Sequence, residues 1–312
     1  MNDQLAVVLR RTAGALGCLV ACSNIEAQDA RPEASASGGF KWVNAVPADL
    51  PATPALVHLT FHSQANHTDV GYFIVFPRGY EAAGAERSRF PVIYYLHGGV
   101  QGGESRGARG SAPLWPMLSA ANYPPAFLVV VNGGKLNYYD TADSKGETAF
   151  RELVAHVDQT FRTLADRRSR VLVGHSMGGR AVGRFVFKFP ELFGSGVALS
   201  GGHQREKHVS ETGNEGKGGA EIGDRANNTF DLASTYVKSA ARPPVRLMVV
   251  VGNQDGNYPA NLEWCMHLSR LRIVHDLVVV PGAGHGLDWK IKDTDRRIFD
   301  FIAEGVLRTS GN

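Results

Sequence analysis

The sequence lacks both a marked excess of charge and any block of basic residues. Its 33 Lys and Arg residues against 30 Asp and Glu residues leave a formal charge of +3 at pH 7. Proteins that bind nucleic acids carry a concentrated positive surface, so this composition excludes nucleic acid as a partner. The chain also has no internal repeat and no metal-ligand spacing, and we therefore expect neither a repeat architecture nor a bound metal or other cofactor.

Cysteine is scarce as well, with three residues in 312, and two of them lie in a segment that predicts export. Residues 1–11 end in two arginines, residues 12–21 are apolar, and Leu19-Val20-Ala21-Cys22 resembles a bacterial lipobox. The apolar stretch is too short to cross a bilayer as a helix. We therefore expect residues 1–21 to be a lipoprotein signal peptide and Cys22 to be the acylated first residue of a bacterial cell-envelope protein, periplasmic or on the outer-membrane side. A plain secretory signal and a twin-arginine signal are the alternatives.

Loss of the signal peptide removes Cys18, and acylation of Cys22 leaves only Cys265, so we expect no internal disulfide. Cys265 lies in ANLEWCMHLSRL, a candidate amphipathic helix, where core packing explains it better than chemistry. Residues 22–54 are rich in Ala, Ser, Gly and Pro, which predicts a flexible tether. With 43% hydrophobic and 20% charged residues, the chain can bury one substantial core, so we expect residues 55–312 to form a single domain.

Short apolar runs alternate with segments of helical spacing, which indicates an α/β fold with a mostly parallel central sheet and helices on both faces. We expect helices at 146–165 and 293–307 and strands at 55–63, 70–77, 91–96, 126–131, 170–173, 195–199, 246–251 and 276–280.

The segment RVLVGHSMGGRAVGRFVFKFP, residues 170–190, carries the most informative motif of the chain. A β-branched run precedes Ser176, glycines surround it, and helical spacing follows it. A G-x-S-x-G between a strand and a helix is typical of the nucleophile elbow of α/β hydrolases. A second match, Gly103-Glu104-Ser105-Arg106-Gly107, lacks a predicted strand before it and a predicted helix after it. We therefore predict that Ser176 is a nucleophile and Ser105 an ordinary loop serine.

A serine hydroxyl needs a base to accept its proton and an acid to orient that base. In open α/β sheets the working residues follow the carboxyl ends of strands. Asp255 follows the apolar run 246–251, and His285 follows the run 276–280. We predict that Ser176, Asp255 and His285 form a catalytic triad. Taken singly, Asp255 could instead cap a helix that begins near residue 259, and His285 could be a turn histidine.

Three other candidates for the acid and the base are rejected. Asp276 and His275 lie at the opening end of their strand rather than at its carboxyl end. His203 follows a strand-like run, but it precedes the acid in the chain, whereas α/β hydrolases have the order serine, acid, histidine.

The tetrahedral intermediate of acyl transfer needs backbone N–H donors for its oxyanion. We predict the amide of Met177, directly after the nucleophile, and that of Gly99, in the loop His97-Gly98-Gly99 after the strand 91–96. Gly99 could also be a plain glycine turn. Arg106 and Arg109 flank this loop and are either solvated or in contact with an acidic substrate.

These segments together resemble an esterase family of α/β hydrolases that includes feruloyl esterases, esterase D and the mycolyltransferases. The resemblance covers residues 57–301 and rests on segments that occur in the family's order: LTFHSQANHTDVGYFIVFPRGYE, PVIYYLHGG, VVVNG, ETAFRELVAHVDQTFRT, GHSMGGRAVGRFVFKFPELFGSGVALSGG, VVVGNQDGNYPAN and VPGAGH. It implies the α/β-hydrolase fold, with Ser176 as nucleophile, Asp255 as acid, His285 as base, and Gly99 and Met177 as oxyanion donors.

The chain departs from the family between residues 203 and 231, where a polar, glycine-rich stretch does not resemble packed core. We expect this insertion to form a mobile flap over the pocket and to influence substrate preference. Within it, His203 and His208 are expected to be solvated rather than zinc ligands.

Two classes of function follow from the triad. An esterase would resolve the acyl-enzyme with water, and an acyltransferase would resolve it with an alcohol or sugar. The resemblance implies acyl esters of carbohydrates, such as feruloyl or acetyl esters, with siderophore esters as a rival and peptide hydrolysis without support. A binding protein on a hydrolase scaffold would be expected to have a damaged triad. We expect a small-molecule or carbohydrate ester as partner and membrane attachment only through Cys22; the oligomeric state is left open.

Overall fold

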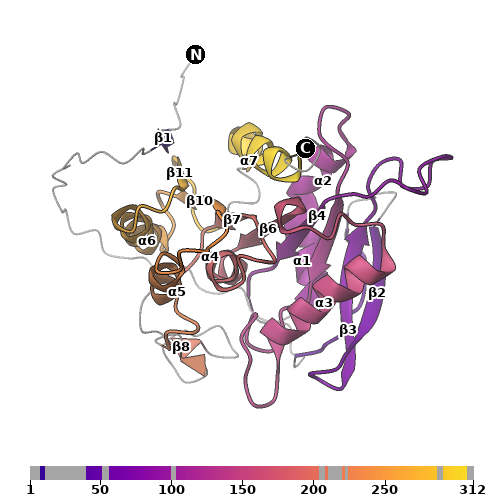
Figure 1. Cartoon of the computed structure of the whole chain (residues 1–312), viewed down its shortest axis with the longest axis horizontal. Coiled ribbons are helices and arrows are strands. Elements are labelled where there is room, and N and C mark those ends of the chain that lie inside the picture. Colours follow the sequence, from indigo (N-terminus) through magenta and orange to yellow (C-terminus); the bar gives the residue numbers. More distant parts are fainter. Residues whose placement is uncertain are drawn as a thin grey trace.

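The computed structural model describes residues 8–10, 40–50, 56–99, 103–203, 208–209, 220–221, 224–286 and 291–307. Within these residues, the largest element is a nine-stranded sheet with helices on both sides (Figure 1). Its strand order is β1-β11-β10-β7-β6-β4-β5-β3-β2. The strands are β1 (Val8–Arg10), β2 (Leu56–Ser63), β3 (Thr68–Val75), β4 (Val92–Leu96), β5 (Phe127–Val131), β6 (Arg170–His175), β7 (Ser195–Leu199), β10 (Arg246–Gly252) and β11 (Asp276–Val280).

The centre of the sheet is parallel, from β11 across to β5. β3 and β2 extend it in antiparallel orientation at one edge, and β1 pairs antiparallel with β11 at the other. Strands covered on both faces are apolar without alternation, and β4, β5 and β7 are buried along their whole length. The predicted α/β fold with a mostly parallel sheet is therefore confirmed.

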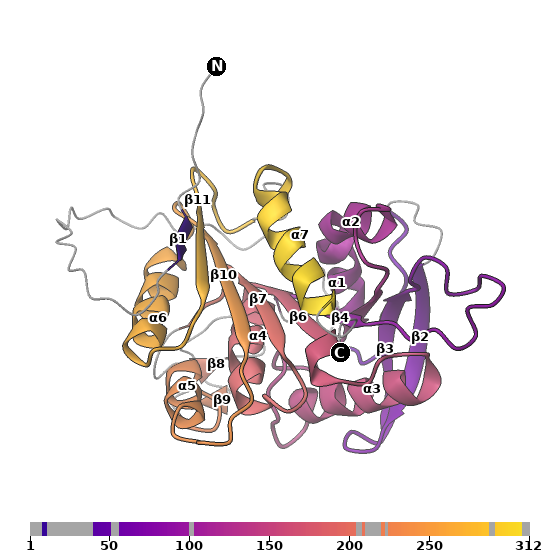
Figure 2. The ribbon, with the colours of Figure 1, turned by 45° about the horizontal axis from the view of Figure 1, so that its top comes forward.

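Helices from distant parts of the sequence share each face of the sheet (Figure 2). One face is covered by α1 (Gly103–Ser111), α2 (Trp115–Ser119) and α7 (Ile291–Leu307), and the other by α3 (Gly146–Thr160), α4 (Met177–Lys188), α5 (Thr229–Tyr236) and α6 (Tyr258–Arg270). No helix of the described residues is long and apolar enough to span a bilayer.

Helix α3 places the ring of Phe150 in the core. The ring of Phe150 stacks on Phe193 with centroids 5.6 Å apart and on Phe185 at 5.4 Å. The helix ends at Thr160, earlier than the predicted residue 165, because Thr163 forms a parallel β-bridge with Phe90. Cys265 is 5% exposed in α6, as expected for core packing.

The prediction that residues 203–231 lack packed core is wrong at the end of this segment. Residues 204–207, 210–219 and 222–223 lie outside the described part of the chain, but helix α5 begins at Thr229, within the segment expected to be polar flap. The side chain of Asn228 caps this helix by accepting from the N–H groups of Phe230 and Asp231, and Phe230 is 2% exposed. Polar composition hid a helix because only one of its faces is apolar. Two short strands, β8 (His208–Val209) and β9 (Ala220–Glu221), pair antiparallel between these segments.

His203, expected to be solvated, is completely buried. Its ring stacks on Trp264 of α6 with centroids 3.7 Å apart. Burial, followed by the charge of Arg180, holds the pKa of His203 well below its usual value, so the ring is neutral. The packing of α6 against the end of β7 therefore decides the environment of His203.

The signal peptide, the lipobox at Cys22 and most of the tether lie outside the described residues and stay predictions. Strand β1 falls within the predicted signal segment and pairs only with β11, at the outer edge of the sheet. Removal of residues 1–21 would leave β11 as the edge strand.

Candidate active site

The parallel strands bring their carboxyl ends to one edge of the sheet. The register pairs Leu96 with Gly174, His175 with Leu199, and Gly252 with Val280. The residues that follow these strands therefore share one edge, which is where α/β sheets place their ligands. Ser176, Asp255 and His285 all lie in loops at this edge.

Ser176 occupies a strained turn between β6 and α4. Its backbone has φ 57° and ψ −117°, a conformation that residues with a Cβ rarely adopt. The Ser176 N–H donates to the carbonyl of Leu199 at 2.8 Å, and the Ser176 carbonyl accepts from the N–H of Arg180 at 3.0 Å in the first turn of α4. The strand and the helix thus hold the serine at the apex of the turn.

Two glycines of the motif allow this turn. A Cβ on Gly178 would overlap the backbone carbonyl of Leu96, and a Cβ on Gly174 would overlap the carbonyl of Gly178. The first turn of α4 therefore packs backbone against backbone on β4 and β6, which only glycine permits.

The side chains of Ser176, His285 and Asp255 form a continuous hydrogen-bonded row. The distance from Ser176 Oγ to His285 Nε2 is 2.8 Å, and His285 Nδ1 lies 3.1 Å and 3.2 Å from the two carboxylate oxygens of Asp255. A carboxylate only accepts, so Nδ1 carries the proton and Nε2 is free to accept from the serine hydroxyl. The side chain of His285 is 45% exposed and that of Asp255 only 1%.

Asp255 is kept charged by its surroundings. Burial alone would raise the pKa of Asp255, but hydrogen bonds from His285 and from the N–H of Asn257, the latter at 2.8 Å, lower it below its usual value. The bond to Asn257 lies just before α6, which begins at Tyr258. The carboxylate of Asp255 thus accepts a hydrogen bond from the residue before α6 and also contacts His285.

The loop that carries His285 is fastened to the loop that carries Asp255. The N–H of Gln254 donates to the carbonyl of Ala283 at 2.9 Å, and the side chain of Asn253 accepts from the N–H of Gly282 at 2.7 Å. From the other side, His175 Nε2 donates to the main-chain carbonyl of His285 at 2.7 Å. His175 was not predicted as a site residue, although its position directly before Ser176 in the sequence was a usable signal.

The glycine loop after β4 lies against the nucleophile. A Cβ on Gly98 would be 2.9 Å from Ser176 Cβ and 2.9 Å from the carbonyl oxygen of His175. Gly99 has φ +70°, which favours glycine. Met177 is the first residue of α4, and the residue is 8% exposed. The roles of Gly99 and Met177 as oxyanion donors stay predictions.

His97 holds this loop and was not assigned a role from the sequence. Its Nε2 accepts from the N–H of Gly133 and its Nδ1 donates to the carbonyl of Gly98, each at 3.2 Å. Burial lowers the pKa of His97 to about 4, so the ring is neutral. The signal was the histidine that directly precedes the two glycines.

The second G-x-S-x-G match lies in helix α1, not in the loop that the sequence indicated. Ser105 Oγ donates to the carbonyl of Ala45 at 2.5 Å, and the residue is 7% exposed. Its neighbour Glu104 is fully buried and accepts from the side chains of Asn44 and Asn132, each at 2.8 Å. Ser105 is therefore structural, as predicted, but for a reason that only the packing reveals.

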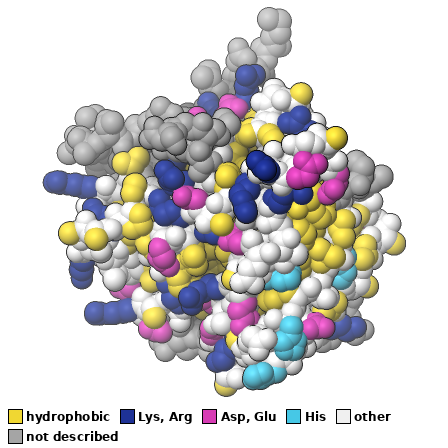
Figure 3. Space-filling view, turned by 45° about the vertical axis from the view of Figure 1, so that its right-hand side comes forward, with side chains coloured by type: hydrophobic (Ala, Val, Ile, Leu, Met, Phe, Trp, Pro, Cys, Tyr) yellow, Lys and Arg dark blue, Asp and Glu magenta, His cyan; other side chains and the backbone are white. Residues whose placement is uncertain are grey.

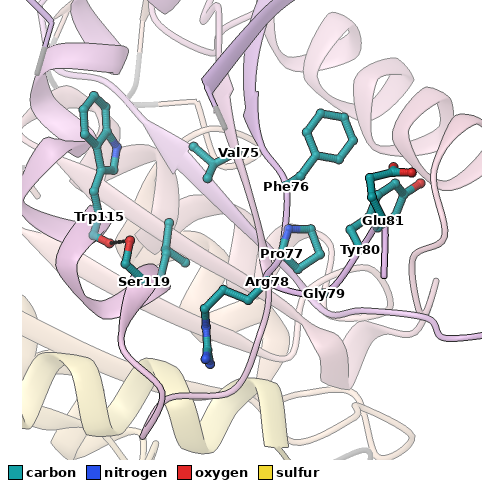
Figure 4. Close-up of a pocket in the computed structure, with 10 residues that line it drawn as sticks. Val75, Phe76, Pro77, Arg78, Gly79, Tyr80, Glu81, Trp115 and Ser119 are labelled. Carbon is teal, nitrogen blue, oxygen red and sulfur yellow. Dashed lines mark hydrogen bonds between the residues drawn. The ribbon is translucent and has the colours of Figure 1, made fainter. Parts of the chain in front are cut away.

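A separate cavity of about 460 Å³ lies between the segment after β3 and α2 (Figure 4). Its lining includes Phe76, Arg78 and Trp115, and Ser119 Oγ donates to the carbonyl of Trp115 at 3.1 Å. Because β3 runs antiparallel to β5, the end of β3 lies at the sheet edge opposite to Ser176. On the face shown in Figure 3, basic, acidic and hydrophobic side chains are interspersed.

The comparisons with known proteins place this site in a family context. The model of the prolyl oligopeptidase family matches residues 133–307. A combined endo-1,4-beta-xylanase/feruloyl esterase of Xylanibacter ruminicola is 28% identical over 162 residues, which are 49% of this chain and 22% of that protein. The chain thus spans about a fifth of the length of this relative.

Two solved structures with the same fold align with this chain over nearly their whole length. The fluorophosphonate-binding serine hydrolase F of Staphylococcus aureus has a TM-score of 0.65 at 18% identity and covers 80% of this chain and 98% of that chain. A CE1 ferulic acid esterase of Anaeromyces mucronatus has a TM-score of 0.58 at 18% identity, and the alignment covers 86% of this chain and 99% of that chain. These likenesses confirm the α/β-hydrolase fold predicted from the motifs.

Since the family model spans more than half of the chain and includes the segments that carry Ser176, Asp255 and His285, the chain belongs to the prolyl oligopeptidase family of α/β hydrolases.

Proposed function

We propose that the protein is a serine carboxylic-ester hydrolase that acts through an acyl-enzyme on Ser176. The observation that carries the proposal is the hydrogen-bonded row from Ser176 Oγ through His285 to the buried carboxylate of Asp255. The esterase named in the relative from Xylanibacter ruminicola favours ester substrates over peptides.

In the first half of the reaction, Ser176 Oγ attacks the acyl carbonyl carbon and its proton moves to His285 Nε2. Asp255 stabilises the imidazolium that forms. The amides of Met177 and Gly99 donate to the oxyanion. Collapse of the tetrahedral intermediate breaks the ester bond, and the departing alcohol takes the proton from His285.

In the second half, water attacks the acyl-enzyme while His285 accepts its proton. The second tetrahedral intermediate collapses, Ser176 recovers its proton from His285, and the carboxylic acid leaves. An acyltransferase would use the same residues with a sugar or alcohol in place of water. The half-buried Ser176 is accessible to either acceptor.

For the natural substrate we propose feruloyl or acetyl esters of carbohydrates. The feruloyl esterase from Xylanibacter ruminicola and the ferulic acid esterase with the same fold support this proposal. Siderophore esters are the rival. The family match favours peptide bonds as the second candidate for hydrolysis. A non-catalytic role on this scaffold has no supporting feature, because the three side chains are complete and in contact.

The test is a panel of aryl acetate, feruloyl ester, acetylated sugar, siderophore ester and peptide substrates, with the Ser176→Ala variant as the blank. Acetate or ferulate release by the wild type, with an acyl group found on Ser176 by mass spectrometry, would support the proposal. Addition of excess free sugar separates the two acceptors, since only a transferase would form a new sugar ester. Cleavage of peptides alone would overturn the ester assignment.

We also propose that Cys22 is lipidated and anchors the domain to the cell envelope. Labelled fatty acid should enter the bacterially expressed full-length protein, and Cys22→Ser should abolish the label and release the protein from membranes. Unchanged membrane attachment of that variant would contradict the anchor.

A further inference from the structure

Arg106 in α1 packs against the glycine loop that also contacts the nucleophile. A Cβ on Gly99 would be 2.8 Å from Cζ of Arg106 and 3.1 Å from both Nε and Nη1. These nearly equal distances show that the face of the guanidinium covers Gly99. Gly98, the preceding residue, faces Ser176 in the same way.

This arrangement sets how far the charge is from the reaction. Adjacent Cα atoms are about 3.8 Å apart, so the guanidinium lies within about 13 Å of the Ser176 side chain. A substrate group two to four bonds from the reacting carbonyl can bridge that distance. The charge also acts on the loop itself, because after burial Arg106 is a cause of the lowered pKa of His97.

The guanidinium of Arg106 has its hydrogen-bonding edges available. The side chain is exposed, and within the described residues it makes no hydrogen bond or ion pair. Arg109, one turn further along α1, is also exposed but binds the carboxylate of Asp49 through Nε at 3.0 Å and Nη2 at 2.6 Å. Among the residues that the structure describes, α1 therefore presents one arginine with a carboxylate partner and one without.

Negative charge at the site is already compensated. Asp255 is buried and bonded to His285, and Glu104 is buried among Asn44, Asn132 and His58. An anion that approaches Ser176 therefore meets Arg106 without a competing carboxylate from these groups. A guanidinium edge fits a carboxylate through two parallel N–H bonds.

We propose that Arg106 determines specificity by binding a carboxylate of the substrate, carried a few bonds from the reacting ester. The proposal rests on the esterase function proposed above and deepens it: the preferred esters are anionic. Binding at Arg106 lowers KM, because the contact is made equally in the bound substrate and in the transition state.

The test compares matched anionic and neutral esters. On the acyl side the pair is mono-p-nitrophenyl succinate and p-nitrophenyl butyrate; on the alcohol side it is 4-acetoxybenzoate and its methyl ester. Arg106→Gln should reduce the preference for the anionic member of one pair roughly tenfold, mainly through KM. Arg106→Lys should retain part of it, and Arg109→Gln should retain all of it. The pair that responds identifies which side of the ester carries the carboxylate.

Three results decide against the proposal. Equal losses on anionic and neutral esters would mean that Arg106 supports the oxyanion loop for every substrate. No change in either pair would mean a solvated arginine. If the wild type hydrolyses none of the esters, calorimetry of monomethyl glutarate binding to the wild type and to Arg106→Gln tests the anion site separately from the esterase function. Binding that depends on Arg106 would support the anion site although the esterase assignment fails. Binding that does not depend on Arg106 would reject the anion site as well.

Discussion

The two G-x-S-x-G segments of this chain have the same pattern and opposite structures. In the first, Ser176 lies in a left-handed turn between a strand and a helix, and its hydroxyl contacts His285 at 2.8 Å. In the second, Ser105 lies inside α1, and its hydroxyl donates to the carbonyl of Ala45. The strained turn leaves the Ser176 hydroxyl facing His285 at the site, whereas the Ser105 hydroxyl is bonded to a backbone carbonyl inside the packed structure. The pattern therefore marks glycines close to a serine, and only the surrounding elements decide what the serine can do.

His97 lies between the two segments. A Cβ on Gly178 of the first would be 2.8 Å from its carbonyl oxygen, and a Cβ on Gly107 of the second would be 3.4 Å from its Cβ. The two segments are thus packed against the same loop, so changes in either one can be compared directly through activity and stability.

The largest expected difference is between the two serines themselves. Ser176→Ala should reduce kcat for p-nitrophenyl acetate by about 10³- to 10⁶-fold, because the nucleophile is lost and only the binding and oxyanion contacts remain. Ser105→Ala should stay within a few-fold in kcat and lose about 1 kcal/mol of unfolding free energy with its hydrogen bond. Steady-state kinetics and urea denaturation measure both. Comparable activity losses in the two variants would remove the distinction between the segments.

The acid should be nearly as important as the nucleophile. Asp255→Asn should lower kcat by about 10⁴-fold, since an amide does not hold the required tautomer of His285 or stabilise its charged form. Asp276→Asn, at the opening end of β11, is the matched control and should retain activity. If instead Asp255→Asn were fully active, the row from Ser176 through His285 would not be the catalytic unit.

The last glycines of the two motifs should differ in stability. Gly178→Ala places a Cβ against the rigid backbone of Leu96 and should cost more than about 3 kcal/mol, enough to prevent folding. Gly107→Ala meets a methyl group of Val130, which can move, and should cost about 1–3 kcal/mol. Denaturation midpoints and soluble yield give the order. Equal costs would show that the backbone contact of α4 is less demanding than its geometry indicates.

The last expected effect is a pH dependence of stability at His97, which appears only at acidic pH. Burial lowers its pKa from 6.5 to about 4, so the folded protein keeps the ring neutral where the unfolded chain binds a proton. The contribution of neutral His97 to the free energy of unfolding is complete above about pH 6.5. It is lost as the pH falls toward 4, by at most about 3 kcal/mol. His97→Gln should flatten the stability curve in this window, measured by denaturation at several pH values. Groups such as Asp255 titrate in both proteins and cancel in the difference; parallel curves would exclude this role for His97.

The predictions made from the sequence were most accurate where local pattern and burial agree. The strands 195–199 and 276–280 were predicted with their observed bounds, because each is a short run rich in apolar residues that is followed within two residues by glycine or proline. The helix after Ser176 was predicted because strand, glycines and helical spacing adjoin one another. Helix α1 was missed because its sequence, GESRGARGS, has little helical propensity and is stabilised by its packing on β5 and by Glu104.

The sequence by itself determined the order and identity of the candidate catalytic side chains, because each follows a strand and the parallel arrangement brings strand ends together. Only the tertiary structure decided how these side chains are supported. His203 stacks on Trp264, His175 contacts the loop of His285, and Ser105 donates to the carbonyl of Ala45. Each contact joins residues that are far apart in the chain. Such contacts leave no local pattern, because their energy depends on which surfaces meet after the elements have formed.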